Sequence, residues 1–244
     1  MRARIQKHWG YEMDLIIEGI VKAFHLIVAF DPEVLSISFL SLRVSGLATI
    51  VSLVIGISVG TTMSLTSFPG KSYVVSIVNA GMGLPPTVVG LFVSIFLWRS
   101  GPLGFLKLLY TPTAMVIAQS VIAIPIVTGL TIGAIQNVPP GLRLQTLALG
   151  ATRLQMLWVI IKEARLPLMA AVMAGFGRVI SEVGASIMVG GNVQGYTRVL
   201  TTATVMETGR GDFEVAIALS IILLILVYLV NLILTRIQQR ERPR

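Results

Sequence analysis

The sequence predicts an all-α integral membrane protein, a helical bundle of five core spans preceded by an amphipathic helix. Three observations carry this prediction: apolar residues make up 55% of the 244-residue chain, charged residues only 12%, and cysteine is absent. Soluble domains carry about twice that share of charged residues, so the composition excludes an ordinary water-soluble protein. Without cysteine and with two histidines, the chain has no basis for disulfides, metal sites or a catalytic triad.

Five stretches are long and apolar enough to cross a bilayer, which takes about 20 residues of helix. Four of them have long charge-free cores, and the remaining one is interrupted only by Arg178 and Glu182. Glycine and proline mark the connections between them, and no soluble domain fits between the spans. The predicted spans are 41–65, 73–98, 113–135, 167–190 and 214–236.

The segment before the first span is more polar. Asp14, Glu18, Lys22 and His25 recur at helical spacing and share one stripe, opposite an apolar side. This favours an amphipathic helix in the membrane interface, because four polar side chains on one segment cost several kcal/mol in hydrocarbon. A sixth span stays the alternative, since it would place the basic N-terminal tail in the cytoplasm. The predicted domains are a basic tail with this helix (1–30), a transmembrane domain (31–236) and a basic cytoplasmic tail (237–244).

Lysine and arginine predict the orientation, because cytoplasmic loops of membrane proteins are enriched in both. The loop 137–165 and the C-terminal tail each carry four basic residues against one acid, and both lie on one side of a five-span bundle. That side is predicted to be cytoplasmic. The net charge of +8 follows these topology signals, so no nucleic-acid partner is expected.

The loop 137–165 is too polar at its edges to span and too apolar for a free linker. Pro139 and Pro140 begin it, and Gly150 divides it into two predicted helical pieces, as glycine does at helix C-termini. Such a projection can place apolar residues in a groove of a second protein. The alternative is an amphipathic helix pair packed on its own bundle, and the pattern leaves both interpretations open.

This loop resembles the cytoplasmic loop of ATP-binding cassette (ABC) importer permeases. Gly150 followed by Ala151 and Thr152 matches the family's central glycine, and Leu166-Pro167 matches its closing pair, four residues later than usual. Leu144, Gln145 and Thr146 replace the family's Glu-Ala-Ala. Further stretches are similar to molybdate permeases and most similar to tungstate permeases: 31–49, 67–72, 83–91, 100–105, GRVISEVGASIMVGGN with GYTRVLTTA (177–203), and ETGRGDF (207–213).

The resemblance implies a type I ABC importer permease, a multi-pass protein of the inner (plasma) membrane of a prokaryote. It implies import of an oxyanion, tungstate first, with molybdate or another oxyanion as the alternative. The implied partners are a second copy in a homodimer, two copies of an ATPase subunit, an extracytoplasmic tungstate-binding protein and membrane lipid. The expected contacts to the ATPase are Arg143, Leu144, Gln145, Thr146, Leu147, Ala148, Leu149, Gly150, Ala151 and Thr152.

No cofactor or catalytic residue is expected in this chain. Gly70-Lys71-Ser72 imitates the end of a phosphate-binding loop, but Leu65 stands where that motif needs glycine. ATP and magnesium are therefore expected in the partner ATPase. Two rival classes are weaker: a self-powered secondary transporter should show inverted repeats and a charged midplane site, and a membrane enzyme should show a catalytic constellation.

Two places in the spans could line a gate or path. Pro85 and Pro86 remove backbone donors within the second predicted span, so the region from Asn79 to 90 is either a hinge beside the path or a packing kink. Arg178 and Glu182 stand four residues apart and are expected to face each other as an ion pair or at the gate. The resemblance adds Ser181 and Gly184 to this second place, because its motif lies beside the translocation path.

Two further patterns leave alternatives open. Ser52, Gly56 and Gly60 form a small-residue stripe, either for packing within one subunit or for a dimer seam. The outward loop after the fourth span carries hydroxyl, amide and guanidinium groups that can hold an oxyanion or meet a binding protein. Its candidate residues are Asn192, Thr197 and Arg198.

Overall fold

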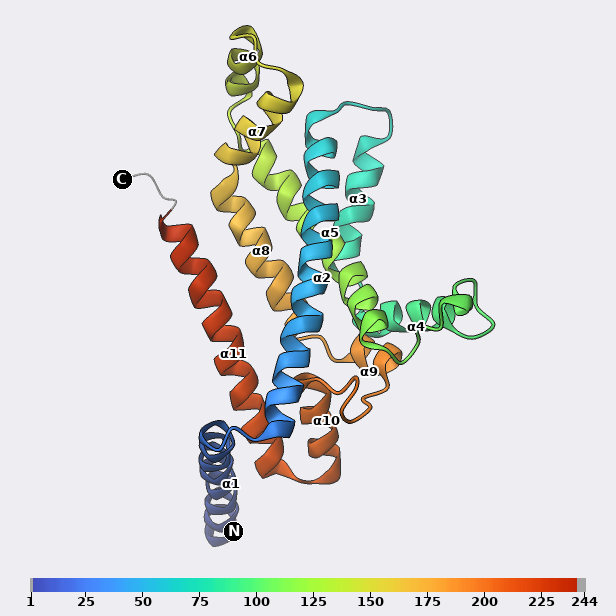
Figure 1. The fold of residues 1–244 in the computed structure, drawn as a ribbon. Coiled ribbons are helices and arrows are strands. Elements are labelled where there is room, and N and C mark those ends of the chain that lie inside the picture. Colours follow the sequence, from blue (N-terminus) through green and yellow to red (C-terminus); the bar gives the residue numbers. More distant parts are fainter. Residues whose placement is uncertain (1, 241–244) are drawn as a thin grey trace.

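The fold in Figure 1 is a computed structural model that describes residues 2–240, and the side chains from Asp14 onward. Residues 241–244 of the predicted basic tail and the side chains of the N-terminal basic residues lie outside this description. Within it the chain is helical and has no strand. The elements are α1 (Arg2–Val28), α2 (Pro32–Leu65), α3 (Lys71–Met82), α4 (Pro86–Leu97), η1 (Gly104–Leu106), α5 (Pro112–Gln136), α6 (Pro140–Ala148), α7 (Arg153–Glu163), α8 (Arg165–Ile180), α9 (Gly184–Gly190), α10 (Leu200–Arg210) and α11 (Phe213–Arg240).

The five predicted spans are confirmed, but two of them are broken. Among the described residues, α2, α5 and α11 are each long and apolar enough to cross a membrane alone. The second span consists of α3 and α4, which meet at an angle of 101°, and the fourth consists of α8 and α9, which meet at 57°. The first break lies at the predicted hinge or kink around Pro85 and Pro86, whereas the break within 167–190 was not predicted.

Helices α2, α5 and α8 pack together as the core of the bundle. The small-residue stripe on α2 lies against α5: a Cβ at Gly56 would approach Val127 Cγ1 to 2.7 Å, and one at Gly60 would approach Thr131 Cβ to 2.7 Å. The hydroxyl of Ser52 donates to the carbonyl of Ala48 within α2. The stripe therefore serves packing within the subunit, which decides between the two interpretations that the sequence left open.

The α3–α4 break follows from the two prolines. Pro86 has no N–H and disfavours the helical conformation in the residue before it. Pro85 accordingly has extended backbone, with φ −63° and ψ 125°, and α4 starts at Pro86. Figure 1 shows α4 running sideways out of the bundle after this break.

The orientation of the bundle follows from its charges. Helices α6 and α7 lie at one end with the C-terminus of α11, while α1 and α10 lie at the other (Figure 1). The first end carries one acid and seven basic residues within the described part, so the positive-inside rule predicts that it faces the cytoplasm. These residues are Glu163, Lys71, Arg143, Arg153, Lys162, Arg165, Arg236 and Arg240.

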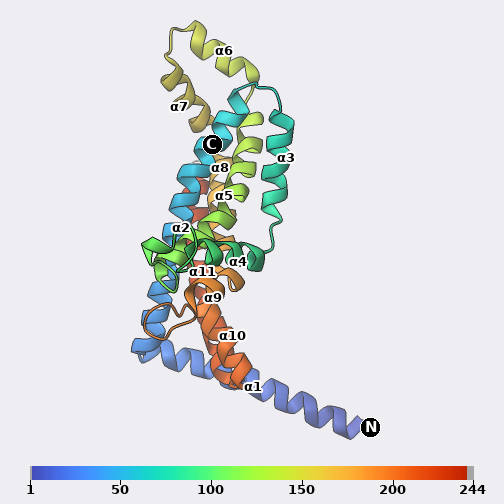
Figure 2. The ribbon, with the colours of Figure 1, turned by 90° about the vertical axis from the view of Figure 1, so that its right-hand side faces the viewer.

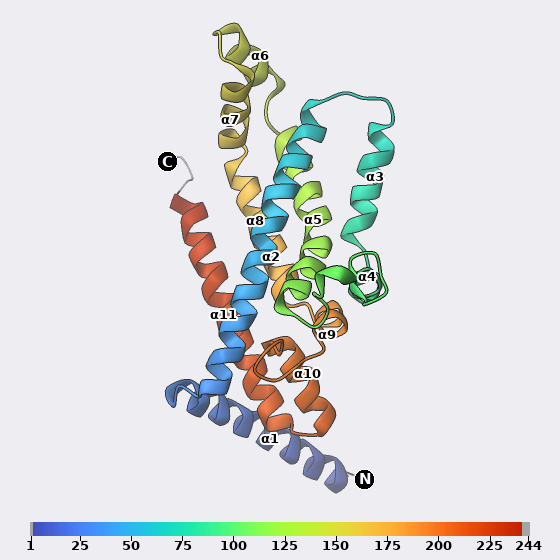
Figure 3. The same cartoon turned by 45° about the vertical axis from the view of Figure 1, so that its right-hand side comes forward.

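Helix α1 lies across the outer end of α11, as Figures 2 and 3 show from two sides. Gly19 makes the close contact, because a Cβ there would lie 2.5 Å from Ile217 Cγ2. Lys22 forms an ion pair with Glu214 at 3.5 Å. Exposed apolar side chains such as Phe24 cover another face. Helix α1 thus has protein-facing, apolar and polar faces, which is the geometry of an interfacial amphipathic helix.

Candidate functional site: a projecting loop and two broken spans

The cytoplasmic loop 137–165 forms the predicted helix–Gly–helix arrangement. Gly150 adopts φ +83°, a left-handed conformation that favours glycine. The N–H of Gly150 donates to Leu147 O at 3.0 Å, and that of Ala151 donates to Thr146 O at 3.2 Å. This pair of bonds is a Schellman motif, which ends α6. Thr152 then caps α7 through reciprocal bonds with Gln155.

The two helices of the loop have different surroundings. Helix α7 buries Met156 and Ile160 against Ile135 of α5 and Leu168 of α8. Burial of two such side chains contributes about 1.5–3 kcal/mol each. Helix α6 buries no residue at all, and it projects beyond the bundle in Figures 1 and 2. The loop is therefore anchored by α7 and presents α6.

Exposed apolar side chains form a crest on this loop, which we define as Leu144, Leu147, Leu149, Leu154 and Trp158. Leu149 is 89% exposed and Leu154 78% exposed. Large apolar groups concentrated at a water-facing projection mark an interaction surface. The alternative that both helices pack on their own bundle is wrong for α6. All ten residues predicted to contact the ATPase, 143–152, lie on α6 and the turn after it.

Two basic residues of the loop, Arg143 and Lys162, have local partners. Arg143 Nη1 donates to Leu65 O at 3.2 Å and so ties α6 to the end of α2. Lys162 lies 4.8 Å from the centroid of the Trp158 ring, in a cation–π contact. Arg143 thus holds the projection in place in addition to lying on its surface.

The two breaks in the spans lie side by side because α4 packs against α9. A Cβ at Gly90 would lie 2.7 Å from the Cα of Ala185, so only glycine permits this approach. The hydroxyl of Ser94 donates to Met188 O at 3.3 Å. The structure thereby brings the second half of the candidate gate region 79–90 next to Gly184, the end of the other candidate region.

The predicted ion pair between Arg178 and Glu182 is wrong. Helix α8 ends at Ile180, so the two residues do not share a continuous helix, and no ion pair joins them. Glu182 is 3% exposed, and its Oε1 accepts a 2.9 Å hydrogen bond from the N–H of Ala185. Its carbonyl accepts from the hydroxyl of Thr201 at 3.1 Å. Glu182 therefore stabilises the break by capping α9.

The other candidate path residues lie on exposed surface. Asn79 is exposed on α3, a helix that buries no residue. Ser181 is exposed at the α8–α9 break, and its hydroxyl donates to Gly177 O at 2.8 Å. Pro85 is exposed, whereas Pro86 is half-buried.

The outer loop uses its polar groups internally. Thr197 is fully buried, donates to Gly190 O at 2.6 Å and accepts from the N–H of Val193 at 2.9 Å. Asn192 Oδ1 accepts from the hydroxyl of Thr202, and Arg198 pairs with Glu33 at 3.5 Å. These groups shape the loop. The residue types alone did not reveal that Thr197, Asn192 and Arg198 have partners within the chain, although the buried Nε of Arg198 has none among the described residues.

One buried polar pair was missed by the sequence reasoning. Gln119 of α5 is 2% exposed and donates from Nε2 to the hydroxyl of Ser186 on α9 at 3.1 Å. This bond ties α9 to the core next to the break. A lone glutamine within an apolar span was the available signal. No group of three or more candidate metal ligands occurs among the described residues.

Five spans, two of them broken, with a projecting cytoplasmic loop make up the fold of type I ABC importer permeases. The MetNI methionine ABC transporter in an inward facing conformation superposes with a TM-score of 0.73 at 23% identity, over 86% of this chain and 97% of that one. The fold-class prediction is confirmed.

Residues 52–244 match the family described as binding-protein-dependent transport system inner membrane component, and the chain belongs to this family. It is therefore a multi-pass transport subunit of the inner membrane and not an enzyme. The tungstate uptake system permease protein TupB of Peptoclostridium acidaminophilum is 40% identical over 93% of this chain and all of its own length. A probable anion ABC transporter permease protein of Haloferax volcanii is 41% identical over 86% of this chain and 92% of its own.

Proposed function

We propose that the chain is the membrane-spanning subunit of an ATP-driven tungstate importer, with molybdate or another oxyanion as the alternative cargo. The tungstate assignment is supported by the relative that is named for tungstate uptake and aligns over its full length. The relative described as an anion permease supports the broader class of cargo. The observation that carries the ATP-driven mechanism is the crest on α6 and α7, whose apolar side chains are exposed outside the bundle.

Two copies of a separate ATPase subunit, one for each permease copy, would dock on this crest. Apolar side chains on a short helix suit a groove in a partner, as in helix-in-groove recognition. ATP and magnesium would be bound by that partner. Closure of the two ATPases would then move the two loops toward each other.

The structure offers a direct route for this movement into the membrane. Met156 and Ile160 fix α7 to the ends of α5 and α8. Ala164, which is 1% exposed, is both the last cap of α7 and the first cap of α8, so no flexible linker separates the two helices. Movement of the loop would displace α8, and α8 ends at the break where α9 packs on α4. The contact between α9 and α4 is therefore the proposed gate.

A second copy of the chain would complete the path. The α3–α4 break is exposed at Gly83, Leu84 and Pro85, and exposed polar residues of α3 include Ser76 and Asn79. Irregular backbone within a membrane is tolerated where protein or water covers it, not lipid. A homodimer that joins these faces would enclose a polar route. An extracytoplasmic binding protein would deliver the anion at the outer loop, which Arg198 and Glu33 hold against the start of α2.

The docking claim is tested by Leu149→Asp, with Phe213→Asp at the outer end of α11 as the control. Both substitutions place a charge on an exposed apolar position, but only Leu149 lies on the crest. A charge at the centre of an apolar contact costs about 2 kcal/mol or more, so we expect at least about tenfold weaker ATPase binding for Leu149→Asp. The control should bind normally. Unchanged ATPase binding by Leu149→Asp would refute docking on α6.

The cargo claim is tested separately in vesicles that contain the complete transporter. Uptake of labelled tungstate is measured against increasing unlabelled tungstate, molybdate, sulfate and phosphate. Unlabelled tungstate should compete most strongly. If uptake is driven by ATP but is inhibited more strongly by another oxyanion, the chain is still a subunit of an ATP-driven importer, but its preferred substrate is that oxyanion.

A further inference from the structure

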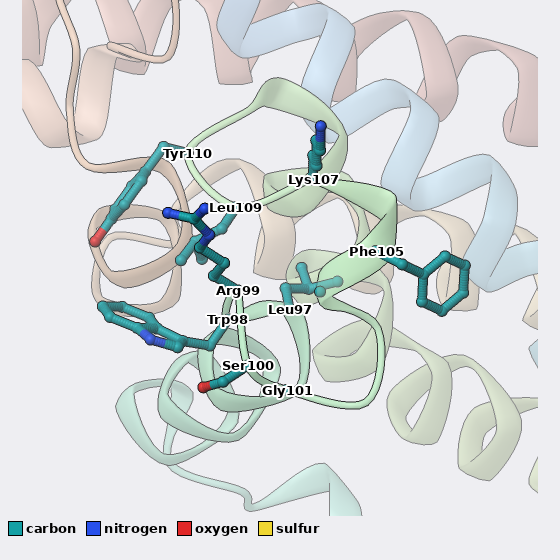
Figure 4. A pocket seen from close by; sticks show the side chains of 10 residues that line it. Leu97, Trp98, Arg99, Ser100, Gly101, Phe105, Lys107, Leu109 and Tyr110 are labelled. Atoms are coloured by element: carbon teal, nitrogen blue, oxygen red, sulfur yellow. The ribbon is translucent and has the colours of Figure 1, made fainter.

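The end of α4 and the loop that follows it surround a cavity of about 830 Å³ that the transport mechanism does not use. Figure 4 shows the side chains of Trp98, Arg99 and Tyr110 gathered on one side of this loop, with Leu97 beside them. Lys107 extends from the rim, and Phe105 points away on the other side. Leu97 is 2% exposed and Leu109 is half-buried, so the inner wall is apolar.

Two glycines shape the cavity. A Cβ at Gly101 would collide with the carbonyl oxygen of Ile95, and one at Gly104 would collide with that of Trp98. The chain therefore folds back tightly on the end of α4. The N–H of Tyr110 then donates to Val189 O at 2.8 Å, which joins the far side of the loop to α9.

The two cationic side chains at this cavity have no partner among the described residues. The side chains of Arg99 and Lys107 are exposed and make no hydrogen bond or ion pair there. Lys22, Arg198 and Arg210 differ, because each of them pairs with a carboxylate. No acid lines the cavity, and the sequence contains no acidic residue between Glu33 and Glu163. The cavity therefore presents two positive charges with no carboxylate among its lining residues.

We propose that this cavity holds the phosphate of an anionic phospholipid head group, with Arg99 as its main ligand. The loop lies at the outer end of the third span, where tryptophan and tyrosine rings occupy the boundary between water and lipid. The guanidinium of Arg99 presents a bidentate donor pair for phosphate oxygens. Lys107 adds a second charge, and the hydroxyl of Tyr110 adds a neutral donor. The apolar wall suits the glycerol backbone and the first part of the acyl chains.

The volume of the cavity favours a lipid head group over the transported anion as its ligand. A free tetrahedral oxyanion occupies roughly 120 Å³, taking about 30 Å³ for each oxygen as for water. The cavity is several times larger and is open to the side. A head group with its glycerol fills such a space, whereas a small dianion would leave the aromatic rings and the apolar wall without contacts. A bound lipid would lie between α4 and the start of α5, next to the contact that Tyr110 makes with α9.

Trp98 provides the readout. Replacing Trp9 and Trp158 by phenylalanine leaves Trp98 as the only tryptophan of the full-length chain. The protein is reconstituted in vesicles with brominated phosphatidylglycerol or brominated phosphatidylcholine at equal mole fraction, and quenching of Trp98 fluorescence is measured. We expect about fivefold stronger apparent binding of the anionic lipid, the factor that one cation near an anionic surface contributes.

Matched variants test the assignment. Arg99→Gln with Lys107→Gln should abolish the preference, and Arg99→Lys with Lys107→Arg should keep it. Lys22→Gln with Arg210→Gln removes the same charge from paired outer residues and should also keep it. Equal quenching by both lipids, or a preference that survives Arg99→Gln with Lys107→Gln, would overturn the proposal.

Two further outcomes would assign the cavity to another occupant. Saturable changes of Trp98 fluorescence on adding tungstate to neutral vesicles, lost in Arg99→Gln with Lys107→Gln, would make it a site for the free oxyanion. Phe105→Cys places a single thiol in a chain without cysteine. A disulfide-linked dimer formed through this thiol would show that a second copy covers the loop. If tungstate causes no saturable change, no disulfide-linked dimer forms and the anionic lipid is preferred, the results support a phospholipid as the occupant of the cavity.

Discussion

Gly150 provides a sharp test of how the cytoplasmic loop works, because its backbone conformation favours glycine while the space around it would admit a side chain. Its φ is +83°, and a Cβ built on it meets no atom within 4 Å. Gly150→Val therefore causes no clash, and its cost is the left-handed backbone, roughly 1–2 kcal/mol for an L-residue. A cost of about 1.4 kcal/mol lowers the equilibrium constant for forming the native turn tenfold. We expect uptake per reconstituted transporter to fall, by at most about the same factor.

Two control variants separate backbone strain from other causes. Gly150→Asn should keep most of the uptake, because asparagine tolerates the left-handed region better than other L-residues. Gly141→Ala, in α6 itself, meets no atom within 4 Å and has no positive φ, so it should be neutral or slightly stabilising. The assay is ATP-driven tungstate uptake into vesicles, with thermal unfolding as the check that the bundle is intact. Native uptake by Gly150→Val, or equal loss in Gly150→Asn, would refute the reasoning.

Further predictions concern the broken spans. Glu182→Ala removes the cap of α9 and should cost about 1 kcal/mol, seen as a fall of about 2–4 °C in the unfolding midpoint, with Glu182→Gln milder. The free energies of unfolding lost in Arg178→Ala and in Glu182→Ala should add within about 0.5 kcal/mol in the double variant. A clearly non-additive double-mutant cycle would show that the two side chains interact after all. In Gly90→Val the new Cβ overlaps the backbone of Ala185, so the variant should lose about 1–3 kcal/mol of stability and its uptake. In Gly177→Val the new Cβ meets no atom within 4 Å, so stability and uptake should be kept. Equal behaviour of the two variants would contradict the close contact of α4 with α9.

The spans and the turn at Gly150 could be predicted because each depends on local properties. Hydropathy over 20 residues identifies a membrane segment, and a glycine after a short amphipathic stretch indicates a left-handed cap. Pro85-Pro86 likewise indicated that the second span is irregular. The sequence did not indicate the 101° angle at which α4 leaves the bundle, because that direction depends on packing against α9.

The pairing of Arg178 with Glu182 failed for a physical reason. Spacing of four residues brings side chains together only within an uninterrupted helix, and α8 ends between them. No proline marks this break. It is stabilised by the Glu182 side chain and by the hydroxyl of Thr201, which lies 19 residues further along the chain. A break that depends on such a long-range contact is not visible in local sequence.

The outer loop shows the same limit for binding residues. Thr197 and Arg198 have the right chemistry for an oxyanion, but their partners are Gly190 O and Glu33. Residue type predicts what a side chain can bind, whereas the fold decides whether its hydrogen bonds are still available.

The central claim is that this chain is moved by an ATPase that docks on its cytoplasmic loop and does no transport alone. The most direct measurement compares tungstate accumulation in vesicles that contain the purified chain alone with accumulation in vesicles that also contain the ATPase, the binding protein and ATP. We predict accumulation against the gradient only in the complete system. Uphill accumulation by the chain alone would contradict the account.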